Sequence, residues 1–472
     1  MAEETQVLVK FVTKLPAHLK VPETPVAVPS TLKRYGLSQI INHLLALDYP
    51  RPFDFLVDGE LVRRSLEQHL LGHNLSAEST LEVEYVPAVV PPQQKSSTPH
   101  DDWVSSVDAS RATPASPASS SAAPGGTIVS GSYDGLLRLW NGELECTASV
   151  AAHAGGVNCA RFLPRSQGDL LLSAGKDLTV KMWRVEGATG GGGGGGKASR
   201  SNPDCRLLAT YRGHVDGVEC VAPSPSGRRF ASSGWDGRLL VWETGRPVAE
   251  AADAEAAEGG TGAAEGSKKK RRVGANGTAG SGSGSGGLSV SEPSTELTGH
   301  LHCISAVSWP AEDVLISGGW DHSVRCWDVS TGVATDTYNG SKAVLSLASH
   351  GSAPHLIAFG CADRALRLWD TRGRAGSDTL AVTTHGSHGN WVTAVAWCPS
   401  SQHHLATASH DGTVKLWDVR TQVSLGSLGA QTGKVLCVGW LGGSEGPARG
   451  LVSGGADCQL RMYESEGALA GL

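Results

Sequence analysis

The segment SGGWDHSVRCW at residues 317–327 is one copy of the pattern that decides the fold. Hydrophobic residues alternate on both sides of a tight turn, which predicts a β-hairpin. An aspartate in the turn is followed six residues later by an aromatic residue, and this interval recurs unchanged along the chain. The seven pairs are Asp134/Trp140, Asp177/Trp183, Asp236/Trp242, Asp321/Trp327, Asp363/Trp369, Asp411/Trp417 and Asp457/Tyr463.

The spacing between copies predicts a repeat architecture. Successive turn aspartates lie 43, 59, 85, 42, 48 and 46 residues apart. A period of roughly 40–45 residues is typical of WD-repeat blades, and seven copies suit an all-β propeller. We therefore expect a seven-bladed propeller over residues 100–466. Low-complexity sequence at 110–126, 187–203 and 246–295 is expected to form solvated loops.

Each complete copy also carries a histidine and a hydroxyl at fixed positions. A carboxylate, an imidazole, a hydroxyl and an indole N–H can satisfy one another in a closed hydrogen-bond network. Five copies of one grouping indicate architecture, whereas a Ser/His/Asp catalytic triad, the alternative interpretation, is needed once. The predicted networks combine His100, Ser130, Asp134 and Trp140; His153, Ser173, Asp177 and Trp183; His214, Ser232, Asp236 and Trp242; His300, Ser317, Asp321 and Trp327; and His388, Thr407, Asp411 and Trp417.

Two copies depart from this pattern. The fifth has Gly340 and Phe359 in place of the histidine and hydroxyl, and the seventh has Gln431 in place of the histidine. We expect these two blades to be held by packing alone. The outer strand of the seventh blade has two possible sources, a segment near Val86–Val90 or the tail after Tyr463.

The residue before each turn aspartate is expected to project at one rim of the propeller. Large aromatic residues at exposed turns are typical anchors of protein interfaces. The alternative is that they pack on neighbouring blades. The candidates for partner binding are Tyr133, Trp235, Trp320 and His410.

The N-terminal residues 5–86 have a different pattern. Apolar runs at 7–12 and 21–28 predict a strand pair, and Leu37 to Leu45 carries the stripe of an amphipathic helix. A strand at 53–57, a short helix near 66–71 and a strand at 81–85 follow. This order suits a ubiquitin-like α+β domain. A proline-bearing linker is expected at 87–99.

Composition narrows the function classes. Lys+Arg total 40 against 46 Asp+Glu, for a net charge of −6, so nucleic acid is not the first-choice partner. No apolar run is long enough to span a membrane.

The ten cysteines form no CxxC pair and indicate reduced thiols rather than a metal site. Gly191–Ser199 is similar to a phosphate-binding loop, but Ala198 occupies the position after the lysine where such a loop has a serine or threonine. A basic cluster is a candidate nuclear import signal, comprising Lys268, Lys269, Lys270, Arg271 and Arg272.

These motifs together resemble a known family. TLKRYGLSQIINHLL, PFDFLVDGELVRRSL and LSAESTLEVEYV are similar to the notchless-like (NLE) ubiquitin-like domain. Followed by HDDWVSSV, SGSYDGLLRLW and SGGWDHSVRCWD, they resemble the WD-repeat ribosome-biogenesis factors of the Pescadillo–Bop complex. The resemblance covers nearly the whole chain apart from the low-complexity loops.

The resemblance implies a non-enzymatic scaffold of the nucleolus and nucleoplasm that matures large-subunit pre-ribosomes. It implies that the propeller binds a Bop-type propeller protein within a complex that contains Pescadillo. It also implies that the AAA ATPase midasin grips the NLE domain, with Glu78 completing the coordination of midasin's magnesium ion. No cofactor or metal of the chain's own is expected.

Two alternatives remain open at this point. A notchless-type pre-ribosome factor shares the N-terminal domain, but its array is longer by about one repeat. A substrate-receptor propeller of a ubiquitin ligase would need an adaptor-binding motif outside the propeller, and we find none in the sequence.

Overall fold

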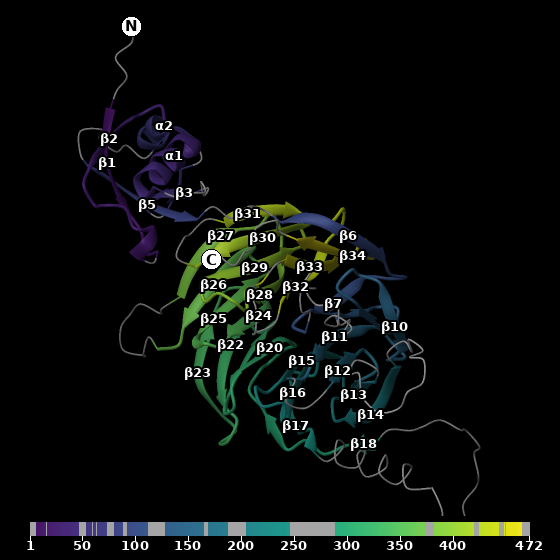
Figure 1. The fold of residues 1–472 in the computed structure, drawn as a ribbon. Helices are drawn as coiled ribbons and strands as arrows, with labels where there is room; N and C mark the ends of the chain where they lie inside the picture. The colour runs from purple at the N-terminus through teal and green to yellow at the C-terminus, as the bar shows by residue number, and fades with distance from the viewer. Residues whose placement is uncertain are drawn as a thin grey trace, which may run out of the picture. The chain divides into compact units, whose positions relative to one another are not determined.

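The computed structural model describes residues 6–15, 17–46, 53–58, 60–62, 64–72, 80–87, 92–111, 128–164, 169–186, 204–245, 288–372, 382–419, 424–442, 448 and 450–464. The chain divides into two compact units. Figure 1 labels the helices and strands of both. The first unit contains the N-terminal domain and residues from Lys342 onward, and the second contains most of the chain between Ser105 and Ser341.

The N-terminal domain is a mixed sheet with two α-helices. Its elements are β1 (Gln6–Val12), a 3-10 turn (Ala17–Leu19), β2 (Val26–Pro29), α1 (Arg34–Leu45), β3 (Phe53–Val57), β4 (Glu60–Leu61), α2 (Leu66–Gly72) and β5 (Leu81–Pro87). The strand order is β2-β1-β5-β3-β4, with β1 parallel to β5. Phe11, Phe53 and Tyr85 meet edge-to-face in its core. The predicted α+β domain is therefore present.

The second strand of this domain is shorter than predicted. The sequence pattern placed it over 21–28, whereas β2 begins at Val26. Pro22 and Pro25 precede it. Since proline has no N–H to donate to a neighbouring strand, the ladder starts only after the second proline.

The second unit contains four antiparallel sheets, which we call blades 1 to 4. Blade 1 is β7 (Val104–Asp108), β8 (Ile128–Ser132), β9 (Leu136–Trp140) and β10 (Cys146–Ala151); blade 2 is β11 (Val157–Phe162), β12 (Leu170–Gly175), β13 (Thr179–Glu186) and β14 (Asp204–Arg212); blade 3 is β15 (Val218–Pro223), β16 (Arg229–Gly234), β17 (Leu239–Glu243) and β19 (Thr295–Leu297); and blade 4 is β20 (Ile304–Ala311), β21 (Val314–Gly319), β22 (Ser323–Asp328) and β23 (Val333–Asn339).

The first unit contains blades 5 to 7. Blade 5 is β24 (Val344–His350), β25 (Ala353–Cys361), β26 (Ala365–Asp370) and β27 (Val382–Ser387); blade 6 is β28 (Val392–Trp397), β29 (His404–Ser409), β30 (Thr413–Asp418) and β31 (Ser424–Gly429); and blade 7 is β32 (Val435–Leu441), β33 (Gly450–Gly455), β34 (Gln459–Glu464) and β6 (Gln93–Pro99). With these sheets the fold class is the predicted all-β WD-repeat propeller with an N-terminal α+β domain.

The outer strand of blade 7 differs from both predicted sources. β6 pairs with β34, from Gln93 opposite Glu464 to Pro99 opposite Gln459. Residues 93–99 were predicted to be linker because they are polar and bounded by prolines. An outermost blade strand is solvated on one side, so it needs no apolar run and no hydrophobic periodicity marks it.

The end of the third low-complexity segment also forms a strand. β18 (Leu288–Val290) was predicted to lie in a loop, but it pairs in parallel with β14 of blade 2. Leu288 and Val290 pack against the core of that blade. A three-residue strand is too short for a period-2 pattern to stand out in the sequence.

Side-chain hydrogen bonds connect neighbouring blades within each unit. The residue after the first residue of an inner strand donates to a backbone carbonyl oxygen of the next blade. Ser105 Oγ bonds the oxygen of Val157 at 2.5 Å, Asn158 Nδ2 that of Val218 at 2.9 Å, and Thr393 Oγ1 that of Val435 at 2.7 Å. These bonds fix the register between blades and so position the turns at the rim.

Candidate functional site

Four of the predicted polar networks are complete. In each, the histidine Nδ1 contacts the turn aspartate, its Nε2 contacts the hydroxyl, and the tryptophan Nε1 donates to the same hydroxyl oxygen. The histidine–carboxylate distances are 2.7 Å for His153–Asp177, 2.9 Å for His214–Asp236, 2.8 Å for His300–Asp321 and 3.0 Å for His388–Asp411. The indole–hydroxyl distances are 2.9 Å for Trp183–Ser173, 2.8 Å for Trp242–Ser232, 2.8 Å for Trp327–Ser317 and 2.7 Å for Trp417–Thr407.

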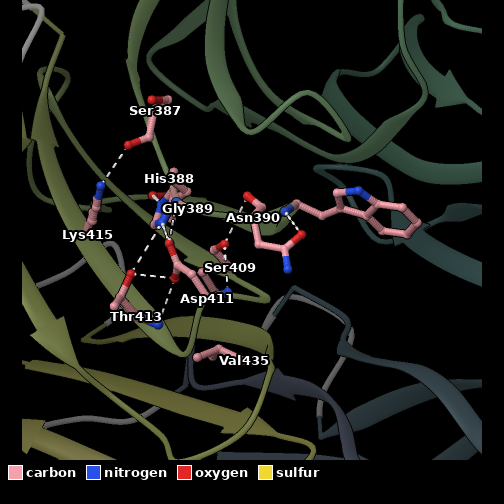
Figure 2. Close-up of polar contacts among 12 residues, drawn as sticks. Ser387, His388, Gly389, Asn390, Ser409, Asp411, Thr413, Lys415 and Val435 are labelled. Atoms are coloured by element: carbon pink, nitrogen blue, oxygen red, sulfur yellow. Dashed lines mark hydrogen bonds and ion pairs between the residues drawn. The ribbon is translucent and has the colours of Figure 1, made fainter.

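The proton positions can be assigned in the network of blade 6, whose His388, Asp411 and Thr413 are drawn in Figure 2. Trp417 donates to Thr407, the Thr407 hydroxyl donates to His388 Nε2, and His388 Nδ1–H donates to Asp411. We assign this histidine tautomer because it gives each donor in this row of hydrogen bonds one acceptor. Asp411 accepts a further bond from the backbone N–H of Gly389 at 2.7 Å. The carboxylate therefore pins both the turn and the loop that faces it.

Burial and hydrogen bonding act against each other on the ionisable groups of this network. Burial alone would raise the pKa of Asp411, but bonds from Thr413, Gly389 and His388 lower it to about 2. Burial lowers the pKa of His388, against the attraction of Asp411. A neutral imidazole beside an ionised carboxylate is the state that the proton arrangement requires.

Blades 1, 5 and 7 use a different partner for the turn aspartate. In each of these blades the arginine four residues after the aspartate donates to its carboxylate. The distances are 2.7 Å for Arg138–Asp134, 2.5 Å for Arg367–Asp363 and 2.6 Å for Arg461–Asp457. The expectation that blades 5 and 7 are held by packing alone is therefore wrong. The D-x-x-x-R spacing is visible in the sequence, but it does not identify these blades by itself. Asp321 and Arg325 have the same spacing in blade 4, where Asp321 bonds His300. His100, predicted for the network of blade 1, belongs to the other compact unit from Ser130. Within blade 1 the tryptophan part of the network is present, since Trp140 Nε1 donates to Ser130 Oγ at 2.8 Å.

A repeated backbone hydrogen bond brings two rim positions side by side in each of six blades. The residue before the turn aspartate donates its N–H to a carbonyl three residues after the histidine position, which is occupied by Gly340 in blade 5 and by Gln431 in blade 7. The pairs are Lys176–Gly156, Trp235–Gly217, Trp320–Cys303, Ala362–Ala343, His410–Trp391 and Ala456–Lys434, at 2.8–3.0 Å. Large side chains at these positions are consequently presented together at the rim.

One cluster of rim side chains lies on blades 3 and 4, and we call it the acidic pair site. The ring centroids of Trp235 and Trp320 are 5.7 Å apart, and the side chains are 50% and 38% exposed. With the highly exposed Leu301 they border a hollow of about 370 Å³. Its remaining lining residues are Asp236, Gly237, His302 and Cys303.

Carboxylates surround this hollow. Trp235 Nε1 donates to Glu219 at 3.1 Å. Burial raises the pKa of the Cys303 thiol, and the nearby charges of Glu219, Asp216 and Asp236 raise it further. Since a thiol in the lining feels three carboxylates, the hollow lies in negative potential.

A second cluster lies on blades 5 to 7, and we call it the basic pair site. The rings of Trp391 and His410 stack at 5.6 Å between centroids with 23° between planes, and Trp391 is 40% exposed. Burial lowers the pKa of His410, and the charge of Lys434 lowers it further. The neutral imidazole thus lies flat beside an indole, with a lysine close by.

The predicted rim residues therefore have different surroundings. Trp235 and Trp320 are exposed and paired, whereas Tyr133 is half-buried beneath Lys176, whose Nζ lies 3.8 Å from the ring centroid. For Tyr133 the alternative of packing on a neighbouring blade holds. Sequence reasoning missed Trp391 and Leu301. The signal was the second rim position, where the motif HGNWV places a tryptophan three residues after the network histidine.

Several predicted features lie outside the described residues. They are Glu78, the basic cluster Lys268–Arg272, and the low-complexity segments at 112–126, 187–203 and 246–287. Across the described ranges, no group of three His, Cys, Asp or Glu side chains is arranged to hold a metal ion. No helix among those ranges has the length and apolar character to cross a membrane.

Comparison with known protein families defines the class of protein to which the chain belongs. A model of the NLE (NUC135) domain matches residues 7–70. A model of the WD domain, G-beta repeat, matches 92–141, 144–184, 205–243, 291–328, 332–370 and 380–418. The chain is thus a WD-repeat protein with an N-terminal NLE domain. Apart from β6, blade 7 lies outside the matched segments, in keeping with its Gln431 and Tyr463.

Relatives over the full length define the family. The chain is 72% identical over 467 residues to the ribosome biogenesis protein WDR12 homolog of Chlamydomonas reinhardtii, covering 99% of both chains. It is 39% identical to the homolog of Oryza sativa subsp. japonica, over 96% of this chain and 95% of the relative. It is 33% identical to the ribosome biogenesis protein ytm1 of Aspergillus oryzae, over 99% and 97%. The chain belongs to this WDR12/Ytm1 family of WD-repeat ribosome biogenesis proteins.

Proposed function

We propose that this chain is a non-enzymatic scaffold in maturation of the large ribosomal subunit, working in the nucleolus and nucleoplasm. Its propeller binds a Bop-type propeller protein within a Pescadillo-containing complex. The AAA ATPase midasin binds its NLE domain through Glu78 and releases the complex from pre-ribosomes. Lys268–Arg272 serves nuclear import. Family membership supports the pathway, and the acidic pair site supports the mode of partner binding.

The observation that carries the partner-binding proposal is the exposure of Trp235, Trp320 and Leu301 in one cluster. Leaving two indoles half in water costs free energy that burial in an interface recovers. The surrounding carboxylates favour a partner surface with positive charge, since opposite potentials steer and align association.

The test is affinity capture from nuclease-treated nuclear extract. Trp235→Ala with Trp320→Ala should weaken capture of the Bop-type protein by about 10-fold or more, since truncating each anchor typically costs about 1–2 kcal/mol or more. Trp391→Ala is the matched control, because this tryptophan has nearly the same exposure on a different blade. Equal capture by the double variant and the control would move the interface away from this site. Capture of ubiquitin-ligase subunits in place of ribosome-assembly proteins would contradict the scaffold proposal.

Midasin binding has a separate test. Glu78→Ala should still capture the Bop-type and Pescadillo proteins but should cause late pre-ribosomes to accumulate. Glu67→Ala, which removes an exposed carboxylate from α2 of the same domain, is the control. Normal particle release with Glu78→Ala would contradict the assignment of this residue.

A further inference from the structure

The basic pair site differs from the acidic one in the charges around it. Lys342, Arg364 and Lys434 are exposed on blades 5 to 7, and none forms an ion pair with a described residue. The turn carboxylates of the same blades are neutralised: Asp363 by Arg367, Asp457 by Arg461, and Asp411 by its network. Two acidic residues of the same unit, Asp101 and Asp102, lie in the loop before β7.

The aromatic pair is held rigidly. Gly389 N–H donates to Asp411, Ser409 Oγ donates to the carbonyl of Asn390 at 3.1 Å, and His410 N–H donates to the carbonyl of Trp391. Figure 2 shows Gly389 and Asn390 joined in this way to Asp411 and Ser409. A platform fixed in advance loses little conformational entropy when a planar group stacks on it.

Arg364 occupies a position where its backbone is strained. The residue after the turn aspartate has positive φ in all seven blades as described, and it is glycine in three of them, Gly135, Gly237 and Gly412. Arg364 has φ of 74°. A large side chain in the left-handed region costs free energy that glycine avoids. Leu178, His322 and Cys458 occupy the same position in other blades, with φ of 67°, 68° and 59°, so this strain belongs to the repeat. Arg364 differs from them in presenting an exposed guanidinium that forms no ion pair with any described residue.

We propose that the basic pair site binds single-stranded RNA. A base stacks on the Trp391–His410 pair, and Lys434, Arg364 and Lys342 contact the phosphates on either side. Exposed aromatic faces beside basic side chains are the combination that binds single strands without dependence on sequence. An acidic peptide would satisfy the three cations but would leave the stacked aromatic pair without a role. This proposal is independent of the protein-binding proposal, because it concerns other residues on other blades.

The test uses the full chain and three fluorescent probes in about 50 mM salt. The probes are an oligonucleotide of about 12 uridines, within the span such sites cover, an abasic strand of equal length and charge, and a glutamate peptide of equal charge. We expect the uridine strand to bind most tightly and to quench tryptophan fluorescence. Trp391→Ala should weaken its binding by about 5- to 100-fold, the range of one lost stacking contact.

The cations have a readout of their own. Arg364→Gly and Lys434→Ala should each reduce the slope of log affinity against log salt by about 0.7, the value per phosphate contact on a single strand. Arg364→Gly removes strain, so a loss of binding in this variant is not caused by unfolding. Trp235→Ala, at the acidic pair site, is the matched control and should leave RNA affinity unchanged.

Three results would overturn the proposal. They are equal affinity for the uridine and abasic strands, equal or tighter binding of the glutamate peptide, and RNA affinity that is unchanged by Trp391→Ala. The second of these would assign the surface to an acidic protein segment instead.

Discussion

The acidic and basic pair sites are built alike and charged oppositely. Each presents an aromatic pair at rim positions defined by the same backbone hydrogen bond, Trp320 to Cys303 in one and His410 to Trp391 in the other. Each rests on complete histidine–aspartate networks. Asp216, Glu219 and Asp236 lie near Cys303 in the first, and Lys434 lies near His410 in the second. Arg364 and Lys342 are exposed on blade 5, beside the blade that carries His410, and the Arg364 carbonyl accepts a bond from the His388 N–H. The repeat thus supplies the platform, and the residues that vary between blades decide what the platform can bind.

The largest expected effect tests the shared platform. His300→Ala and His388→Ala each leave a buried hydroxyl and a carboxylate short of a partner, which costs about 2–3 kcal/mol. Hydrogen exchange at the backbone N–H of Trp320 and His410 should detect this loss of local stability. We expect the protection of the N–H in the affected blade to fall by about 30- to 100-fold. His322→Ala, in an exposed turn residue, is the control. Unchanged exchange at both positions would show that the networks do not support the rim.

A second prediction tests the difference in charge. Arg364→Glu with Lys434→Glu should weaken RNA binding by about 10- to 100-fold at low salt, because two attractions become repulsions. Capture of the protein partner should stay the same. Asp216→Lys at the acidic pair site should give the mirror image, weaker partner capture with RNA binding retained. Loss of both activities in either variant would show that the two sites are not separate.

The fold could largely be predicted because its signals are periodic. The unchanging interval from Asp321 to Trp327 repeats in every blade, and the predicted histidines precede the first residues of inner strands, such as Val157 and Val392. β6 and β18 could not be predicted, since an outer polar strand and a three-residue strand carry no period-2 hydrophobic signal. The Arg367–Asp363 pair could not be predicted from the histidine position, because that position holds Gly340 and the group that replaces the histidine is Arg367 on β26.

The candidate sites were predicted less completely than the fold. Trp235 and Trp320 were found because the turn position before the aspartate is easy to align. Trp391 was missed because the position three residues after the network histidine lies in a loop, outside the hydrophobic periodicity of the strands. The backbone bond from His410 to Trp391 identifies that position as a second rim position. Charge around each pair comes from residues far apart in sequence, such as Glu219 and Asp236 beside Cys303, and the tertiary structure is needed to bring them together.

Acid should weaken the platform in two steps. The pKa of His388 is lowered in the folded chain, so the unfolded chain binds more protons below its ordinary value of about 6.5, and stability falls as the pH drops through that range. The pKa of Asp411 is lowered to about 2, so its contribution is lost between about pH 4 and pH 2. Thermal unfolding from pH 7 to about pH 2 measures both steps. His388→Gln should remove the first step, and an unchanged profile from pH 7 to pH 5 would contradict this assignment.

The smallest expected effect separates strain from binding. Leu178 and Arg364 both occupy the left-handed turn position, with φ of 67° and 74°. Replacing either by glycine relieves about 1–2 kcal/mol of strain and adds about 0.5–1 kcal/mol of backbone entropy cost, for a net gain between about 0 and 1.5 kcal/mol. Chemical denaturation should show this gain in both variants. RNA binding should fall for Arg364→Gly and stay constant for Leu178→Gly. If the arginine variant gains stability and loses no affinity, the strained residue is unrelated to binding, and the basic pair site rests on Lys342, Lys434 and the stacked rings.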